Sequence, residues 1–342
     1  MTLKQSYNSI DLMKFILCFL VVAIHSDPIE DVSPLLNRLF LGVERVAVPL
    51  FFIASGFFLF KGGPLDKDHL VKYLKRMGLL YFAWFVISFP ITIFNRFLMG
   101  EGSLPVKLFL FVKSFFFTST FSGSWFLASC VFCTILFYFI NKWFPSKGGW
   151  LIIVFSFLVY FLCVSTSAWG NLMDGIGLRQ SYNNLVFWFA KPYTSILVGI
   201  PYFALGKYIA EHENKISRPN FSITLILFAL LIAEVYITYR FQLSNSTDCY
   251  LMLLPCAFCI FVYFLKWKLK LSHPVEMRKT STIVFFSQFI WIFLIEYVEW
   301  QFHIIIPQIG KFLIAVILCL LTSFAVITLQ KKRRFSWLRF FY

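Results

Sequence analysis

The sequence predicts an all-α fold, a polytopic membrane bundle of about ten transmembrane helices with both termini in the cytoplasm. Of its 342 residues, 59% are hydrophobic and only 14% are charged, and the mean hydropathy is +0.77. Soluble globular domains are much more polar. Apolar runs recur that can cross a hydrocarbon core about 30 Å thick. No soluble-looking stretch exceeds a few tens of residues, so we expect residues 1–342 to form a single membrane domain.

The spans are predicted wherever an apolar run reaches about 17 to 24 residues. They cover residues 10–26, 43–61, 77–98, 124–141, 149–168, 192–210, 220–240, 249–266, 281–299 and 308–330. The segment 104–121 is also apolar, but Lys107 and Lys113 interrupt it, so we expect an interfacial or re-entrant helix there. If this segment crossed the membrane, every later loop would change sides.

The distribution of basic residues indicates the orientation. About two thirds of the 31 Lys and Arg residues fall on the side that carries both termini. Because basic residues concentrate on the cytoplasmic side of membrane proteins, that side is predicted to be cytoplasmic. The net charge of +15 is then explained by loops facing an anionic leaflet, without any nucleic-acid partner. Lys4 precedes an apolar run as in a secretory signal, but Asp11 and Lys14 interrupt that run, so we expect an uncleaved first span.

Polar residues recur along one side of the first span. Asp11, Lys14, Cys18 and His25 are three to seven residues apart, which places them along one side of a helix. Ionisable groups are too costly to face lipid, so this side is expected to face an internal cavity. A titratable imidazole in such a cavity indicates chemistry or translocation.

The eight cysteines include two pairs with the spacing of zinc ligands, at Cys130 and Cys133 and at Cys256 and Cys259. Both pairs fall inside apolar runs, with no His or carboxylate ligand beside them. We therefore interpret them as buried thiols that act as small hydrophobic residues, and expect no metal site.

Several segments resemble a known family. They are Ile10-Asp11-Leu12-Met13-Lys14 followed by His25, the run from Val48 to Phe57, the run from Arg76 to Tyr81, Ser124-Trp125-Phe126-Leu127, and the run from Ser281 to Gln288. Together they resemble the membrane acyltransferase-3 family, whose members O-acylate bacterial surface polysaccharides. The resemblance covers nearly the whole chain in its plan of spans, and the segments at His25 and at Ser55-Gly56 are its more specific parts.

The resemblance implies a multi-pass protein of the bacterial inner membrane. It would take an acyl group, usually acetyl, from cytoplasmic acyl-CoA and deliver it to a hydroxyl of an envelope polysaccharide or of its lipid-linked precursor. Acyl-CoA would be a substrate, and no permanently bound cofactor is expected. The other expected partner is membrane lipid.

Cations at the start of the third span are candidates for holding the phosphates of the donor. Lys72, Lys75 and Arg76 lie there. The family carries an Arg-x-x-Arg pair at this place, of which Arg76 matches the second member while Tyr73 stands at the first. The alternative is that these cations only set the topology.

His25 is the candidate general base, because a neutral imidazole can accept the proton of an acceptor hydroxyl as it attacks a thioester. The alternative is a hydrogen-bonded histidine at the membrane surface. Fourteen helical residues separate Asp11 from His25 by about 21 Å, so Asp11 cannot orient the ring. It is expected to line the cytoplasmic half of the pathway with Lys14 or to pair with it. The candidates for orienting His25 are Asp27, Glu30, Glu44 and Glu299.

Other candidates each have two interpretations. Ser55 and Gly56 either permit close helix packing or leave room for the donor and a backbone N–H near the thioester oxygen. Trp125 is either an interfacial anchor or a pocket wall on the acceptor side. Arg45 either contacts an acceptor or pairs with Glu44.

The ninth span departs from the family pattern. Many members carry a histidine there, where this chain has Gln288. An amide exchanges hydrogen bonds but takes no proton near neutral pH, so either His25 alone suffices or transfer is not the activity. Glu234 and Glu296 are further inward-facing candidates.

Three classes of function therefore remain open at this point. The first is acyl transfer with His25 as the base. The second is a transporter or exporter that moves an amino acid, a polyol or a glycan through the same cavity, since some relatives are attached to amino-acid racemase domains. The third is an assembly subunit that keeps the fold without activity.

Overall fold

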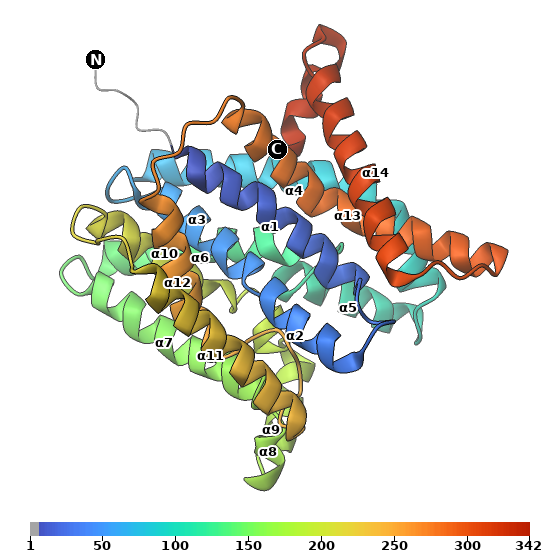
Figure 1. Cartoon of the computed structure of the whole chain (residues 1–342), viewed down its shortest axis with the longest axis horizontal. Coiled ribbons are helices and arrows are strands. Elements are labelled where there is room, and N and C mark those ends of the chain that lie inside the picture. The colour runs from blue at the N-terminus through green and yellow to red at the C-terminus, as the bar shows by residue number, and fades with distance from the viewer. Residues whose placement is uncertain (1–6) are drawn as a thin grey trace. The chain divides into compact units, whose positions relative to one another are not determined.

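The computed structural model describes residues 7–342, so Lys4 lies outside the described part of the chain. Within that part the secondary structure is helical and contains no strand (Figure 1). The α-helices are α1 (Asn8–Ser26), α2 (Pro34–Glu44), α3 (Ala47–Phe60), α4 (Lys67–Ile93), α5 (Leu104–Phe117), α6 (Ser124–Trp143), α7 (Gly148–Thr166), α8 (Leu172–Gly175), α9 (Arg179–Trp188), α10 (Gly199–His212), α11 (Phe221–Arg240), α12 (Leu253–Leu265), α13 (Pro274–Phe302) and α14 (Gln308–Leu329). Shorter elements are the π-helix η1 (Phe94–Leu98) and the 3-10 helices η2 (Pro192–Thr194) and η3 (Arg333–Phe341).

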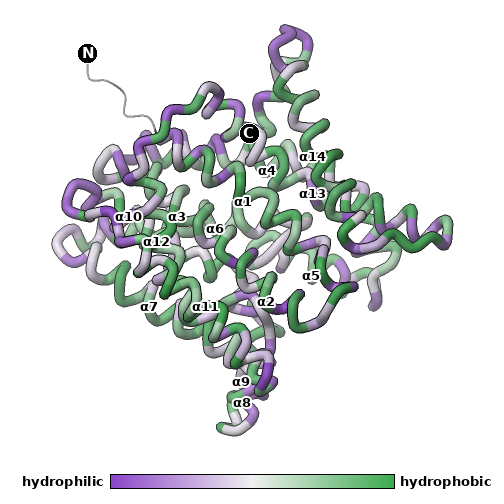
Figure 2. The backbone as a smooth tube through the Cα atoms, in the orientation of Figure 1, coloured by the Kyte–Doolittle hydropathy of each residue, from purple (hydrophilic) through white to green (hydrophobic). Residues whose placement is uncertain are grey.

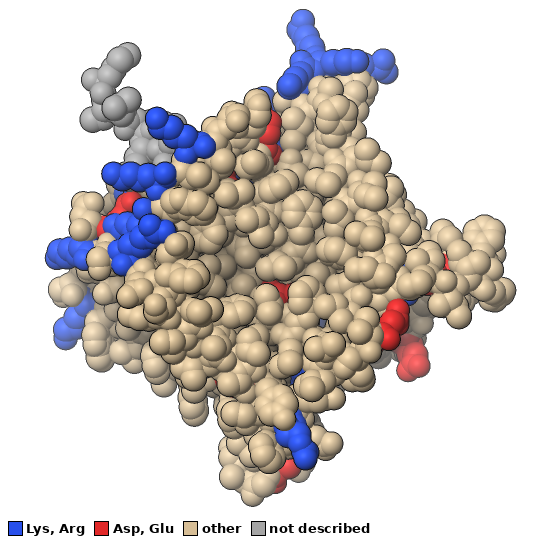
Figure 3. Space-filling model, in the orientation of Figure 1, with Lys and Arg blue, Asp and Glu red and all other residues tan. Residues whose placement is uncertain are grey.

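Eight apolar segments among the described residues are long enough to cross a membrane, which confirms an all-α polytopic membrane protein. They are α1, α2 with α3, α4 with η1, α6, α7, α11, α13 and α14. Figure 2 shows the middle turns of α7, α11 and α14 as hydrophobic and most hydrophilic residues in the connecting segments. On the face drawn in Figure 3, Lys and Arg gather at such segments, including the turn at residues 331–334 after α14.

Two predicted spans form shorter helices. The span predicted at 192–210 becomes α10, with 14 residues, and that at 249–266 becomes α12, with 13. In front of α10, the Ser195 hydroxyl donates to the Pro192 carbonyl and accepts the Leu197 amide N–H, so the chain turns before the helix begins. In front of α12, the Leu251 amide donates to Glu234 at 2.7 Å. Both helices are largely buried, which suits segments that cross only part of a bilayer.

Two other helices begin earlier than predicted. The span predicted at 43–61 begins at Pro34, where the Ser33 hydroxyl caps the helix by accepting from the Leu36 amide, and it bends at Arg45 and Val46 between α2 and α3. The span predicted at 77–98 begins at Lys67, where the Asp66 carboxylate accepts the His69 amide N–H at 2.7 Å. Ser and Asp are preferred residues for this capping role.

The segment predicted to be interfacial or re-entrant forms α5. Its 14 residues are fewer than the about 20 that a helix needs to cross a bilayer. The Lys107 ammonium donates to the Phe97 carbonyl at 2.9 Å, and the Lys113 ammonium donates to the Val186 carbonyl at 3.1 Å. These contacts satisfy both cations within a largely exposed apolar helix.

The chain divides into two compact units. Unit 1 contains the residues up to Ala54, His212–Ile232 and Met252–Tyr342. Unit 2 contains Ser55–Glu211 and Ala233–Leu251. The prediction of a single domain stays a prediction.

In unit 1, α1 packs against α13 and α14. The two helices α1 and α13 run parallel, because Asp11 and Arg278 meet near their first turns and the His25 and Phe289 rings meet further along, with centroids 4.6 Å apart. At the same end as Asp11, the Lys279 ammonium lies 4.7 Å from the ring of the C-terminal Tyr342. The start of α1 and the C-terminus therefore lie at one end of the unit.

In unit 2, α6 packs against α4 and α7. The segment after α7 is hydrogen-bonded to the segment after α11. The Asn245 amide donates to the Ser167 carbonyl at 2.9 Å, and the Cys249 amide donates to the Ser167 hydroxyl at 3.0 Å. These bonds fix the two connections to each other.

Candidate functional site

His25 lines a pocket of about 200 Å³ in unit 1. The pocket lies at the C-terminal end of α1, where Ser26, Asp27 and Glu30 also face it. His25 is an exposed residue, whereas its neighbours Ile24 and Ser26 are buried. The imidazole therefore opens onto the pocket from the last turn of α1.

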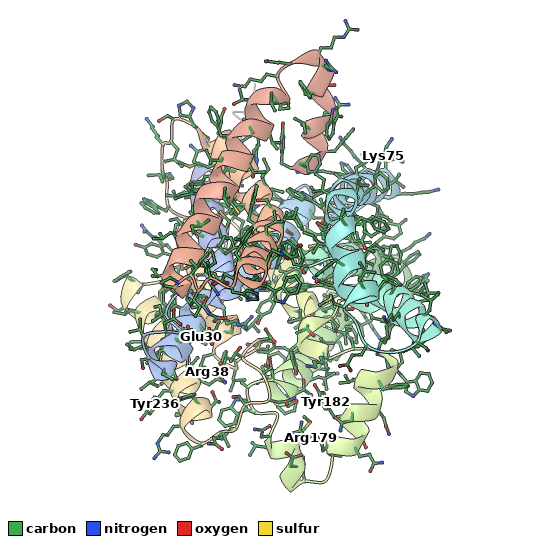
Figure 4. All side chains as sticks on the ribbon, turned by 90° about the vertical axis from the view of Figure 1, so that its right-hand side faces the viewer. Glu30, Arg38, Lys75, Arg179, Tyr182 and Tyr236 are labelled. Atoms are coloured by element: carbon green, nitrogen blue, oxygen red, sulfur yellow. The ribbon has the colours of Figure 1, made fainter. Side chains whose placement is uncertain are left out.

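The end of α1 determines where these side chains point. Asp27 adopts a left-handed conformation with φ of 44°, and its amide donates to the Ala23 carbonyl at 3.0 Å. A residue in this conformation ends a helix and turns the chain sharply. The turn brings Glu30 back over the end of the helix to the same pocket as His25. Figure 4 shows Glu30 beside the α2 segment that carries Arg38.

The opposite wall comes from α13 and α14. Ile292, Ile295 and Glu296 contribute from α13, and Gln308 and Lys311 contribute from the first turn of α14. The Gln308 side-chain amide donates to Glu30 at 2.9 Å, and its backbone amide donates to Asp31 at 2.8 Å. The start of α14 is thus tied to the segment that follows α1.

Lys311 is engaged in a local ion pair. Its ammonium lies 2.9 Å from one Glu299 oxygen, and the other oxygen of Glu299 accepts the Ile306 amide at 2.8 Å. Glu299 is therefore occupied in closing the turn between α13 and α14, and its candidacy for orienting His25 stays a prediction. Asp27 and Glu30 stay candidates for that role, and Glu296, which the sequence marked only as inward-facing, joins them.

Gln288 lies on α13 one turn before Ile292, on the same side of the helix as that pocket residue, and does not itself line the pocket. It is fully buried, and its side-chain N–H donates to the Phe285 carbonyl at 2.9 Å. A carbonyl only accepts, so this bond fixes which end of the amide is oxygen. That oxygen has no hydrogen-bond partner among the described residues.

Glu44 ends α2 and is 1% exposed. Asp27 and Arg45 both act on it electrostatically. One of its oxygens has no hydrogen-bond partner in the described part of the chain. Arg45 follows at the bend between α2 and α3 and is half-buried.

Asp11 and Lys14 lie at the other end of α1. Asp11 is buried and pairs with Arg278, whose guanidinium lies 3.8 Å from the carboxylate, and Lys14 also acts on Asp11 electrostatically. The sequence analysis expected Asp11 either to line the pathway with Lys14 or to pair with it, and it missed Arg278, because that contact joins residues far apart in the chain.

Ser55 and Gly56 lie on α3 in unit 2. A Cβ atom at Gly56 would stand 2.3 Å from the Phe203 carbonyl oxygen of α10. The packing interpretation therefore accounts for Gly56. Ser55 next to it is half-buried.

The cations at the start of α4 are exposed, namely Lys72, Lys75 and Arg76. Figure 4 shows the Lys75 side chain extending outward from the helix. Tyr73 points the other way, towards Thr134 and Cys130 of α6. The residue that replaces the family's first arginine thus packs inside unit 2, and the three cations form an exposed basic surface.

Two further candidates lie in unit 2. Trp125, at the start of α6, is half-buried, and its amide donates to the Ser119 hydroxyl at 3.0 Å. Glu234 accepts from the Trp169 indole at 3.0 Å and from the Leu251 amide, so it fixes the connections after α7 and α11. Glu234 is therefore a structural partner in this structure.

The cysteines are all free and buried. Within residues 7–342, no three His, Cys, Asp or Glu side chains are grouped so that they could hold a metal ion.

Residues 7–328 match the acyltransferase-3 family, described as an acyltransferase domain. The chain belongs to the acyltransferase-3 family. It is also similar to two amino-acid racemases of Enterococcus faecalis, with 25% identity over 98% of this chain and 27% over 78%. A serine/alanine racemase of Enterococcus gallinarum is 21% identical over 97% of this chain. The acyltransferase-3 chain spans about half the length of the first of these relatives, 48%. No solved structure matches it.

Membership of the acyltransferase-3 family supports a membrane acyltransferase. Sequence reasoning placed His25 at the end of the first span and named Asp27 and Glu30, and all three line the pocket. It missed Gln308 and Lys311. A Lys and a Gln at the start of an otherwise apolar span were the available signal.

Proposed function

We propose that this protein is an integral membrane O-acyltransferase that moves an acyl group, usually acetyl, from cytoplasmic acyl-CoA to a hydroxyl of a cell-envelope glycan. The observation that carries the proposal is the position of His25. Its ring faces a polar pocket at the end of α1 opposite to Asp11. By the basic-residue distribution, that end lies on the external side, where an envelope acceptor would enter.

His25 acts as the general base. Its neutral imidazole takes the proton of the acceptor hydroxyl while the hydroxyl oxygen bonds to the thioester carbonyl carbon. The carbon–sulfur bond then breaks, the acyl group stays on the acceptor oxygen, and the imidazolium returns the proton to the thiolate of CoA. Asp27, Glu30 and Glu296 line the same pocket and stabilise the imidazolium electrostatically.

The donor would enter from the cytoplasmic side. Lys72, Lys75 and Arg76 are exposed there and match the phosphates of CoA in charge. Arg76 is the member that corresponds to the family pair. We assign Ser55 to the donor path and Arg45 to the acceptor path, as in the sequence analysis.

A single imidazole is sufficient in this mechanism. Gln288 takes no proton near neutral pH, and its buried amide oxygen is a hydrogen-bond acceptor on the same side of α13 as Ile292. We assign Gln288 to the acceptor side, while His25 carries both proton transfers.

The test measures transfer of label in membranes that contain the protein, supplied with acyl-labelled CoA and envelope glycan. Wild type is expected to label the glycan, and His25→Ala is expected to lose at least about 99% of the rate, the usual scale of a lost general base. His303→Asn is the matched control, because His303 caps α13 in a left-handed conformation that Asn also adopts. Equal labelling by wild type and His25→Ala would overturn the proposal.

A second candidate is passage of an amino acid through the membrane. The names of the relatives favour it, since two are amino-acid racemases and this chain covers about half of the first. Uptake of a labelled amino acid into vesicles that persists in His25→Ala, with no label transferred from CoA, would select this function over acyl transfer.

A further inference from the structure

We propose that the molecule bound in the His25 pocket carries an ammonium group next to its hydroxyl. This rests on the proposed function, because it names the acceptor class of the same site. The argument starts from the charges of the pocket wall.

Carboxylates outnumber cations on this wall. Asp27, Glu30 and Glu296 all line the pocket, and the one lysine that lines it, Lys311, is already paired with Glu299 at 2.9 Å. Glu30 accepts only from the uncharged Gln308 amide. None of the three lining carboxylates forms an ion pair within 4 Å in the described part of the chain. The pocket therefore favours a cation over a neutral or anionic ligand.

Hydrogen bonding gives a second, independent indication. The Gln288 oxygen is fully buried without a partner among residues 7–342, and it lies on the same face of α13 as Ile292 and Ile295, four and seven residues further on. One oxygen of Glu44, which is 99% buried, also lacks a partner there. The Gln288 oxygen only accepts hydrogen bonds, so the group missing there is a donor.

An ammonium group meets both requirements, because it supplies a positive charge and three N–H donors. It also explains which atom reacts. An amine held by carboxylates stays protonated and has no lone pair, so it cannot attack a thioester. The neighbouring hydroxyl, whose proton His25 removes, is then the nucleophile, and the product is an ester.

This chemistry occurs in amino sugars and in hydroxy amino acids. Purified full-length protein, without any acyl donor, is titrated with glucosamine and glucose in one arm and with serine and glycerate in the other. Within each pair the two compounds differ at one position, where the first carries an amine and the second carries a hydroxyl. We expect the amine-bearing member of at least one pair to bind about tenfold more tightly, the scale of one charged hydrogen bond. Which pair shows the preference separates the two sources.

The variant Glu30→Gln/Glu296→Gln is expected to abolish this preference, because it removes two of the three charges and keeps the shape of both side chains. Both residues are exposed. The amide oxygen introduced at position 30 can still accept from the Gln308 amide, so the link between α14 and the segment after α1 is kept. Glu101→Gln, an exposed glutamate of unit 2, is the control and should keep the preference. Equal binding of both members in both pairs, or a preference that survives the double variant, would overturn the inference.

The result of the binding titration can be told apart from the result of the label-transfer assay. A preference for the amine together with no His25-dependent transfer would leave the ligand assignment standing and remove the proposed function. Transfer that depends on His25 but proceeds equally well onto glucose and glucosamine would leave the proposed function standing and remove the ligand assignment.

Discussion

The Arg278 guanidinium lies 3.8 Å from the Asp11 carboxylate and joins the first turns of α13 and α1. The two partners differ in exposure, since the Asp11 side chain is 9% exposed and that of Arg278 is 53% exposed. A buried charge that loses its partner is costly, whereas a half-exposed guanidinium can be hydrated instead.

We expect Arg278→Gln to destabilise the protein more than Asp11→Asn, by about 1 kcal/mol, because only the former takes the ion-pair partner at 3.8 Å away from a buried carboxylate. Thermal unfolding of both variants and of the double variant in the same detergent measures this. The double variant should be no less stable than Arg278→Gln. A larger loss in Asp11→Asn than in Arg278→Gln would contradict the argument.

The contact between α3 and α10 predicts a large effect of one methyl group. Gly56→Ala would place its Cβ 2.3 Å from the Phe203 carbonyl oxygen, so α3 and α10 must separate. We expect a loss of stability of about 1–3 kcal/mol, typical of overpacking, measured by thermal unfolding. The control is Gly78→Ala, in α4, where a Cβ meets nothing within 4 Å. Alanine favours helix there, so the control should be unchanged or slightly more stable.

Binding of acyl-CoA should depend on the exposed cations at the start of α4. Arg76→Ala is expected to weaken binding of acyl-CoA to the purified protein about tenfold, since charged hydrogen bonds to phosphate are among the stronger ones. The difference from wild type should shrink as salt is raised, because exposed charges are screened. Lys147→Ala removes an exposed cation elsewhere in unit 2 and should leave the affinity unchanged. Equal weakening by both variants would show only a general charge effect.

The segment between α7 and α10 contains a pair that predicts a pH dependence. Arg179 donates to Asp174 through Nε at 2.6 Å and through Nη2 at 2.9 Å, and these bonds hold the pKa of Asp174 below its ordinary value. A carboxyl whose pKa is lowered by folding contributes stability above its unfolded pKa of about 3.9, and that contribution disappears as the pH falls through the folded pKa. Figure 4 shows Arg179 on α9 together with Tyr182.

The difference in unfolding temperature between wild type and Arg179→Ala should therefore be constant near neutral pH and should shrink below about pH 4. Unfolding measured from neutral to acid pH checks this. A difference that grows towards acid would mean that the pair does not act through the carboxylate.

Hydrophobicity predicted the fold because most crossings are long continuous apolar helices. It failed where a helix begins with charged turns, as α4 does at Lys67, although Asp66 carries the capping signal. The starts of α10 and α12 depend on turns, and the second is held by a bond between Leu251 and the distant Glu234. Hydropathy contains no information about such contacts.

The candidate site was predictable along one helix and not between helices. The spacing of polar residues along the first span predicted His25, and Asp27 and Glu30 were named from the segment that follows it; all three line the pocket. Glu296 and Lys311 reach the same pocket only because α13 and α14 pack beside α1. Arg278 was missed as the partner of Asp11 for the same reason.

Glu299 holds both Lys311 and the Ile306 amide, so the hairpin between α13 and α14 is closed by its own residues. The pocket wall that α13 and α14 form is consequently held in place before a ligand binds. An entering molecule loses little affinity to ordering the protein, and selection depends on complementarity to a preformed surface.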